Sequence, residues 1–142
     1  MATNTMITAT TGFWVQRKES FNTNAVFTGR ARTNLSYIVS INNGWNFLAW
    51  PCRADRHESA GPAADVGWGF KKSGGIGNSS ATNADTILVV QGNAWKRYFL
   101  LSNGRWWDFM KGGYADFTMQ AGQGFYYYRR GGAMVWTNSY GP

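Results

Sequence analysis

Residues 86–109 read TILVVQGNAWKRYFLLSNGRWWDF, three short runs of aromatic and β-branched residues separated by two turn signals. The runs cover residues 86–91, 95–101 and 105–109. Aromatic and β-branched side chains fit a pleated sheet. The dipeptides Gly92-Asn93 and Asn103-Gly104 suit tight turns whose backbone takes a positive φ. The segment therefore predicts three antiparallel strands joined by two hairpins.

The same pattern continues on both sides of this segment. Further strands are predicted at residues 13–18, 25–29, 36–41, 45–50, 125–130 and 133–137. Asn43-Gly44 and Gly131-Gly132 again indicate hairpin turns. We predict an all-β fold of about ten short, mostly antiparallel strands in a sandwich or barrel. Residues 52–84, rich in Gly, Asn and Ser, are expected to form a long, loop-rich excursion with at most one short strand near Trp68.

The composition fits one domain that works through its surface. The chain has 142 residues, the usual length of a single domain. Aromatic residues reach 17% and charged residues only 15%, against about 25% charged residues in an average domain. The net charge of +7 favours acidic partners such as anionic glycans, an anionic cell surface or nucleic acid. A basic balance also keeps an aromatic-rich protein soluble.

The location of the protein is expected to be extracellular or at the cell surface. Residues 1–4, MATN, lack the basic start and apolar core of a signal peptide, so that signal is expected to lie outside this sequence. No run approaches the roughly 18 apolar residues of a membrane-spanning helix. The lone Cys52 excludes a disulfide within the chain, and we expect a buried, inert thiol.

The two ends of the chain resemble each other. Residues 9–18, ATTGFWVQRK, parallel residues 121–130, AGQGFYYYRR, and residues 26–29, VFTG, parallel residues 135–138, VWTN. We therefore predict a single domain over residues 1–142, in which a hairpin in residues 1–30 echoes residues 117–138 and residues 31–142 form the main unit. Similar hairpins can also recur through composition alone. If the echo is a repeat, the terminal hairpin could pair with another copy by strand addition. The candidate assembly residues are Phe13, Trp14, Val15, Arg17, Val26 and Phe27.

Two segments resemble a known kind of module. Residues 44–51, GWNFLAWP, and residues 119–130, MQAGQGFYYYRR, resemble the paired GWNL–x–x–P and AGxGF motifs of secreted, aromatic-rich β modules in environmental bacteria. The resemblance covers residues from about 41 to 138 and is concentrated in the two motifs. It implies export, a β fold and a role at the cell surface or in a matrix. It supplies no activity and no catalytic residue.

The chemistry that an enzyme needs has no recognisable motif here. Seven carboxylates are present, but no motif pairs two of them as a glycosidase would. His57 is the only histidine, so a nucleophile lacks an evident base and zinc lacks a second ligand at the usual spacing. We predict a solvated loop position for His57. We therefore expect a non-enzymatic protein with no catalytic residue, no metal and no cofactor.

The functional groups that the sequence does provide are aromatic side chains next to basic ones. Successive residues of a strand face opposite sides, so one of Trp106 and Trp107 can join the core while the other faces out. The alternative is that both belong to a core or that one lies at a sheet edge. Trp68 is expected to be exposed in its loop. A core position is expected for Trp50 and Trp95.

Residues 125–130 put rings and guanidinium groups on both faces of one strand. We expect Phe125, Tyr127 and Arg129 on the core side and their alternating neighbours on the outer side. The candidate binding residues are Trp68, Trp106, Trp107, Tyr126, Tyr128 and Arg130. Each also has a purely structural interpretation, as a core ring or a solvated strand end.

These observations leave three functions open. The leading expectation is an extracellular structural or adhesive subunit that associates with copies of itself, by strand exchange of terminal hairpins. The alternative is a monomeric module that binds a glycan through exposed Trp and Tyr rings. Single-stranded nucleic acid is the least favoured partner, since no nucleic-acid-binding motif accompanies the basic and aromatic residues.

Overall fold

The computed structural model describes residues 36–50, 56–58 and 68–139. The strands are β1 (Ser36–Ile41), β2 (Gly44–Ala49), β3 (Arg56–His57), β4 (Thr86–Gln91), β5 (Ala94–Leu100), β6 (Trp106–Asp108), β7 (Gly113–Tyr114), β8 (Thr118–Met119), β9 (Gly124–Arg129) and β10 (Met134–Ser139). The all-β fold predicted from the sequence is confirmed. Within the described part of the chain, no helix is long and apolar enough to cross a membrane.

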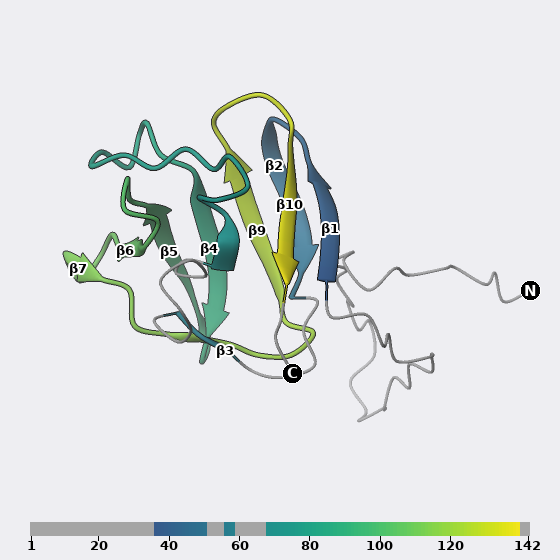
Figure 1. Cartoon of the computed structure of the whole chain (residues 1–142). Coiled ribbons are helices and arrows are strands. Elements are labelled where there is room, and N and C mark those ends of the chain that lie inside the picture. Colours follow the sequence, from purple (N-terminus) through teal and green to yellow (C-terminus); the bar gives the residue numbers. More distant parts are fainter. Residues whose placement is uncertain (1–35, 51–55, 59–67, 140–142) are drawn as a thin grey trace, which may run out of the picture.

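Three antiparallel sheets organise the strands (Figure 1). The largest has the order β2-β9-β4-β5-β6-β7. β1 pairs with β10, and the short β3 pairs with β8. In Figure 1 the β1–β10 pair lies in front of β2 and β9, so the fold has two layers at this end.

Two hairpins follow the prediction. β4 and β5 pair up to Gln91 opposite Ala94, which leaves Gly92 and Asn93 as the turn. β5 and β6 pair across the second turn, at Asn103-Gly104. The positive φ angles of 59° at Gly92 and 86° at Gly104 match the turn chemistry expected from the sequence.

The other two predicted hairpins are wrong in their pairing. β1 does not pair with β2, and β9 does not pair with β10, so residues 117–138 contain no closing hairpin. Instead, residues 36–49 pair along their length with residues 124–139 as one two-stranded ribbon that folds back on itself. At the fold, Asn42 and Asn43 face the four residues 130–133. Because this unequal count interrupts the ladder, each strand switches from one sheet to the other.

Side chains hold this fold in the ribbon. The Nδ2 of Asn43 donates to the carbonyl of Gly131 at 2.8 Å, and the Nδ2 of Asn46 donates to the carbonyl of Asn42 at 2.8 Å. Neither Gly131 nor Gly132 takes a positive φ, so the type I′ turn that a Gly-Gly dipeptide suggests is not formed. The corner therefore depends on asparagine amides that bond to main-chain carbonyls.

The core between the layers is built mainly from aromatic rings. Its largest fully buried side chains include Trp50, Trp68, Trp106, Trp136, Tyr127, Phe70 and Phe125. The ring of Phe70 is stacked on Tyr127 at 4.6 Å and on Trp136 at 4.3 Å. Burying each such ring contributes roughly 1.5–3 kcal/mol. The predicted core position of Trp50 is confirmed, as are those of Phe125, Tyr127 and Arg129.

A buried ion pair joins the core to the end of β9. Asp85 is fully buried, and its Oδ2 accepts from Arg129 Nη1 at 2.7 Å and from the Tyr127 hydroxyl at 2.6 Å. Its two oxygens also accept from the main-chain N–H groups of Ile76 and Arg130. Burial, then the nearby Asp85 charge and its hydrogen bond, raise the pKa of Tyr127 far above its ordinary value, so the hydroxyl remains a donor. Asp85 therefore fixes the main chain at Arg130, which matters for the surface described next.

Candidate functional site

The outer face of the six-stranded sheet carries a row of aromatic side chains. Residues paired across antiparallel strands lie on the same face. The register places Trp45 opposite Tyr128 and Phe47 opposite Tyr126. The alternating residues point into the core: Leu48 of β2, and Phe125, Tyr127 and Arg129 of β9. We call the outward-facing set the aromatic strip. It consists of Trp45, Phe47, Trp95, Tyr126 and Tyr128.

The rings of the aromatic strip are in mutual contact across β2, β9 and β5. Trp45 lies 4.8 Å from Tyr128 and 6.1 Å from Tyr126, measured between ring centroids. Phe47 and Trp95 lie 4.7 Å and 5.6 Å from Tyr126. Trp45 is 56% exposed and Trp95 is 45% exposed. The sheet therefore presents a continuous aromatic surface on its solvent side.

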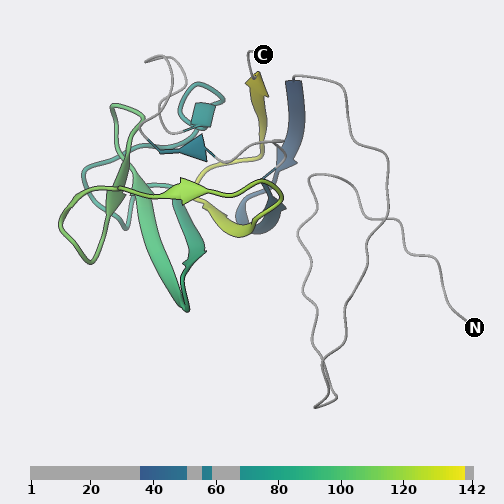
Figure 2. The same ribbon diagram turned by 90° about the horizontal axis from the view of Figure 1, so that it is seen from below.

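The exposure of Trp95 corrects the prediction that this ring belongs to the core. β6 pairs only with Tyr98 to Leu100, and β9 reaches only Val89 of β4. The end of the β4–β5 hairpin thus extends beyond the neighbouring strands, as Figure 2 shows. Trp95 lies on this extension, opposite Val90, and its ring packs on the outer face instead of between layers.

Two arginines border a hollow in this face. The hollow measures about 240 Å³ and is lined by Trp45, Thr86, Arg97, Tyr128 and Arg130. The guanidinium carbon of Arg130 lies 4.6 Å from the ring centroid of Tyr128. That of Arg97 lies 5.4 Å from the ring of Phe109. Each guanidinium is therefore supported by an aromatic ring at the surface, a contact worth about 0.5–1 kcal/mol.

The four carboxylates among the described residues are engaged elsewhere. Asp85 is buried with Arg129, and Glu58 accepts from the main-chain N–H of Trp106 at 3.1 Å and lies 3.5 Å from Arg105. Asp108 accepts from the N–H groups of the turn that follows it. Asp116 lies 2.8 Å from the Nε2 of His57. In the part of the chain that the structure describes, no carboxylate pairs with Arg97 or Arg130.

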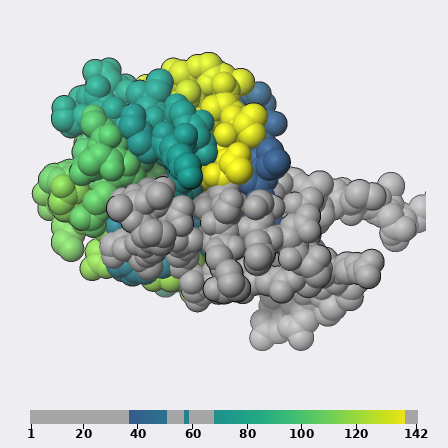
Figure 3. All heavy atoms as spheres, viewed as in Figure 1, coloured from purple at the N-terminus to yellow at the C-terminus, as the bar shows by residue number. Residues whose placement is uncertain are grey.

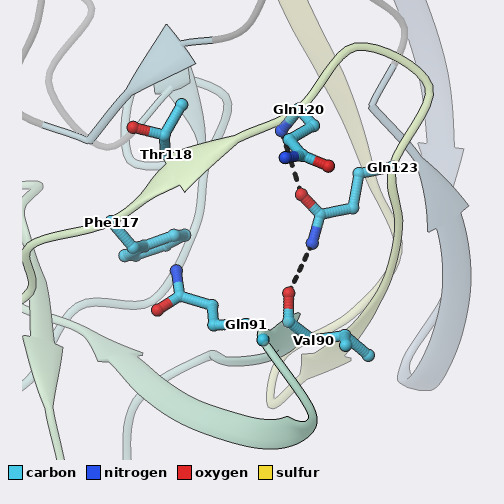
Figure 4. A pocket seen from close by; sticks show the side chains of 7 residues that line it. Val90, Gln91, Phe117, Thr118, Gln120 and Gln123 are labelled. Carbon is cyan, nitrogen blue, oxygen red and sulfur yellow. Dashed lines mark hydrogen bonds between the residues drawn. The ribbon is translucent and has the colours of Figure 1, made fainter.

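A second hollow lies at the opposite end of β4. It measures about 600 Å³ and is lined by Val90, Gln91, Gly92, Phe117, Thr118, Gln120 and Gln123 (Figure 4). The amide of Gln123 donates to the Val90 carbonyl at 2.7 Å and accepts from the Gln120 N–H at 2.9 Å. This amide thus ties the turn before β9 to β4. Because its lining carries no charged side chain, this hollow has no group that could form an ion pair with a ligand, unlike the hollow beside the arginines.

Three of the predicted binding residues come together at the site. Tyr126, Tyr128 and Arg130 lie on the outer face, as the alternation along β9 predicted. Trp106 is fully buried, so the prediction that it is a binding residue is wrong, whereas Trp107 is half-buried and faces outward. Trp107 contacts Tyr114 at 5.6 Å on the same face, beyond the aromatic strip.

The prediction for Trp68 is wrong. Trp68 is fully buried, and its ring lies 5.2 Å from Trp50 and 5.0 Å from Phe117. It forms a 3₁₀ turn with Gly69 instead of the short strand expected nearby, and it has a φ of 57°, a left-handed conformation that non-glycine residues rarely adopt. Its carbonyl accepts from the indole N–H of Trp136 at 2.8 Å. The burial of a large ring offsets the backbone strain.

Sequence reasoning missed Trp45 and Arg97 as site residues. Both could have been found from the alternation of side chains along their strands, since Trp45 alternates with core-facing positions of β2 and Arg97 precedes the buried Tyr98.

The predicted assembly residues, between Phe13 and Phe27, and Cys52 lie outside the described residues. His57 lies in the two-residue strand β3 and not in a loop, while its side chain is 40% exposed and contacts Asp116. No group of three or more His, Cys, Asp or Glu among the described residues is arranged to hold a metal ion.

In comparisons with known proteins, no family model, no curated protein and no solved structure matches the chain.

Proposed function

We propose that the protein is a glycan-binding module that holds an extended polysaccharide on the aromatic strip. The single observation that carries this proposal is the continuous set of ring contacts across three strands on the solvent face of the sheet. Neighbouring strands lie about 4.8 Å apart, so the three spacings from β2 to β5 extend the strip over roughly 14 Å. A surface of that length can contact more than one sugar ring.

The aromatic rings suit sugars for a physical reason. The face of a sugar ring presents C–H groups, and the face of Trp or Tyr offers a large, rigid contact area with little loss of side-chain entropy. Trp45 exposes more than half of its surface and is held from the side by Tyr128. The strip is therefore ordered before the ligand arrives, which lowers the entropic cost of binding.

The test is a binding titration with a panel of soluble polysaccharides, both neutral and anionic, followed by calorimetry. Trp45→Ala is expected to weaken the best ligand by about tenfold, the usual effect of removing a central aromatic contact. Ile38→Ser, which changes an exposed apolar side chain on the β1–β10 ribbon, is the control and is expected to leave affinity unchanged. A panel without any ligand, or equal affinities for wild type and Trp45→Ala, would reject the proposal.

Self-association is a second candidate, and it is favoured by the outer face of the β1–β10 ribbon. Ile38 is 70% exposed and Val135 is 52% exposed on this face. Among the described strands, β1 pairs with β10 only. β1 and β10 lie side by side on the surface in Figure 3. A strand with an open edge and apolar neighbours can pair with a second copy.

Light scattering over a range of protein concentrations tests this second candidate. Association is expected to raise the mass above the 15.8 kDa of one chain, and Ile38→Ser is expected to lower it again. A mass of one chain at every concentration would exclude assembly under those conditions.

A further inference from the structure

Resting on the proposed function, we infer that the site selects polysaccharides bearing anionic substituents, carboxylate or sulfate, and that Arg97 and Arg130 bind these groups. Both side chains line the hollow beside Trp45 and Tyr128. A sugar ring on the aromatic strip would place its substituents next to the guanidinium groups.

The way each arginine is held leaves its donors available. A guanidinium that lies over a ring uses its flat face for that contact, while its N–H groups point outward in the plane. The guanidinium carbon of Arg130 lies over the Tyr128 ring, 4.6 Å from its centroid, and the Arg130 Nε donates to the Ala84 carbonyl at 3.3 Å. The two terminal nitrogens remain for a ligand. Carboxylate and sulfate oxygens match such a pair of parallel donors.

The main chain under Arg130 is fixed from inside the protein. The Arg130 N–H donates to Oδ1 of the buried Asp85 at 2.8 Å. The same carboxylate binds Arg129, the preceding residue, in the core. Arg130 therefore starts from a rigid position, although its side chain is exposed.

The charges on the outer face of the six-stranded sheet also favour an anionic ligand. The outer positions of β2, β9, β4 and β5 carry aromatic, aliphatic, threonine and arginine side chains and no acid. Within the described chain, the carboxylates that could neutralise Arg97 and Arg130 are engaged elsewhere. Two unneutralised guanidinium groups at one hollow make a local positive potential that attracts an anion.

Ring geometry favours a glycan over single-stranded nucleic acid. Successive bases of a strand stack on ring faces. Here Trp45 stands at 83° to Tyr126 and at 60° to Tyr128, and Trp95 stands at 47° to Tyr126. Rings at such angles do not form a series of parallel platforms for successive bases, whereas substituted sugar rings can contact them one at a time.

Matched polymers test the inference. Dextran sulfate is compared with dextran, and polygalacturonate with its methyl ester, so that each pair shares one backbone and differs in charge. An oligothymidylate at the same charge concentration is the nucleic-acid arm. We expect each anionic polymer that binds to bind at least about tenfold more tightly than its neutral partner. Binding of dextran sulfate alone would identify sulfate as the preferred group, and binding of polygalacturonate alone would identify carboxylate.

Two double variants separate this site from general attraction to a basic protein. Arg97→Gln with Arg130→Gln is expected to weaken the anionic polymer by about tenfold or more. Lys72→Gln with Lys111→Gln removes the same charge from exposed positions outside the hollow and is expected to change affinity less than about threefold. Unfolding midpoints in urea establish that both variants are folded.

The remaining outcomes are distinct. Equal affinity for charged and neutral polymers, with the arginine variant unchanged, overturns the inference and leaves the proposed function standing. Equal losses in the two double variants overturn the assignment to these arginines. Tighter binding of oligothymidylate than of any polysaccharide overturns both proposals in favour of nucleic acid, and the absence of any polysaccharide binding rejects the proposed function itself.

Discussion

Replacing Asp85 with asparagine is expected to destabilise the protein by about 3–5 kcal/mol. The carboxylate accepts four hydrogen bonds, from Tyr127, Arg129 and the main-chain N–H groups of Ile76 and Arg130. Asparagine has nearly the same shape but no charge, and its amide nitrogen must face at least one of these donors. Arg129 is only 8% exposed, so it would stay buried without its counter-charge. Removing one partner of a buried ion pair typically costs about 3–5 kcal/mol.

Urea unfolding followed by tryptophan fluorescence measures this loss. The total stability of a small domain is about 5–15 kcal/mol, so a loss of about 3–5 kcal/mol in Asp85→Asn should lower the midpoint by roughly a fifth or more. Asp116→Asn is the control, because its ion pair with His57 is exposed and worth about 0–1 kcal/mol. A loss below about 1 kcal/mol for Asp85→Asn would refute the view that this carboxylate holds the core and the end of β9 together.

Further predictions concern packing, pH and the corner of the ribbon. Gly77→Ala is expected to cost about 1–3 kcal/mol, because the new methyl group would collide with the Leu101 carbonyl, whereas Gly113→Ala meets open space; thermal unfolding compares the two. Burial, followed by the charges of Asp108 and Asp116, raises the pKa of Tyr98 to about 12. Since the unfolded chain loses this proton near pH 10 and the folded protein keeps it, stability should fall from about pH 10 to pH 12, and Tyr98→Phe should reduce that slope in urea titrations. Asn43→Ala removes the amide that bonds to the Gly131 carbonyl and should lower stability by about 1 kcal/mol in the same assay, while an unchanged midpoint would show that the corner does not need it.

Local features of the fold could be predicted from the sequence because each has a local cause. The strands follow from alternating aromatic and β-branched residues, and β1 and β4 begin and end at the predicted residues. Gly92 and Gly104 mark true hairpins, because the two strands that flank each turn pair with each other directly across it.

The corner of the ribbon could not be predicted from the same signals. Asn43-Gly44 and Gly131-Gly132 look like hairpin turns, but their flanking strands find partners far away in the chain. Whether a turn closes a hairpin or bends a ribbon depends on those distant strands, which local sequence does not describe.

Only the part of the candidate site that follows from alternation along a strand could be predicted from the sequence. Alternation placed Tyr126, Tyr128 and Arg130 on one face, as observed. Trp68 and Trp95 were assigned to the wrong environments because their exposure depends on tertiary contacts. A left-handed turn directs Trp68 into the core, and the overhanging hairpin leaves Trp95 outside.

Indole N–H resonances in a nuclear magnetic resonance titration test the central claim most directly, because each tryptophan gives one signal. Trp45→Phe and Trp95→Phe identify the two signals of the aromatic strip. With a binding polysaccharide, we predict that these two signals shift or broaden and that those of the buried Trp68 and Trp136 do not. Saturating ligand that leaves the Trp45 and Trp95 signals unchanged would contradict the account and place the binding surface elsewhere.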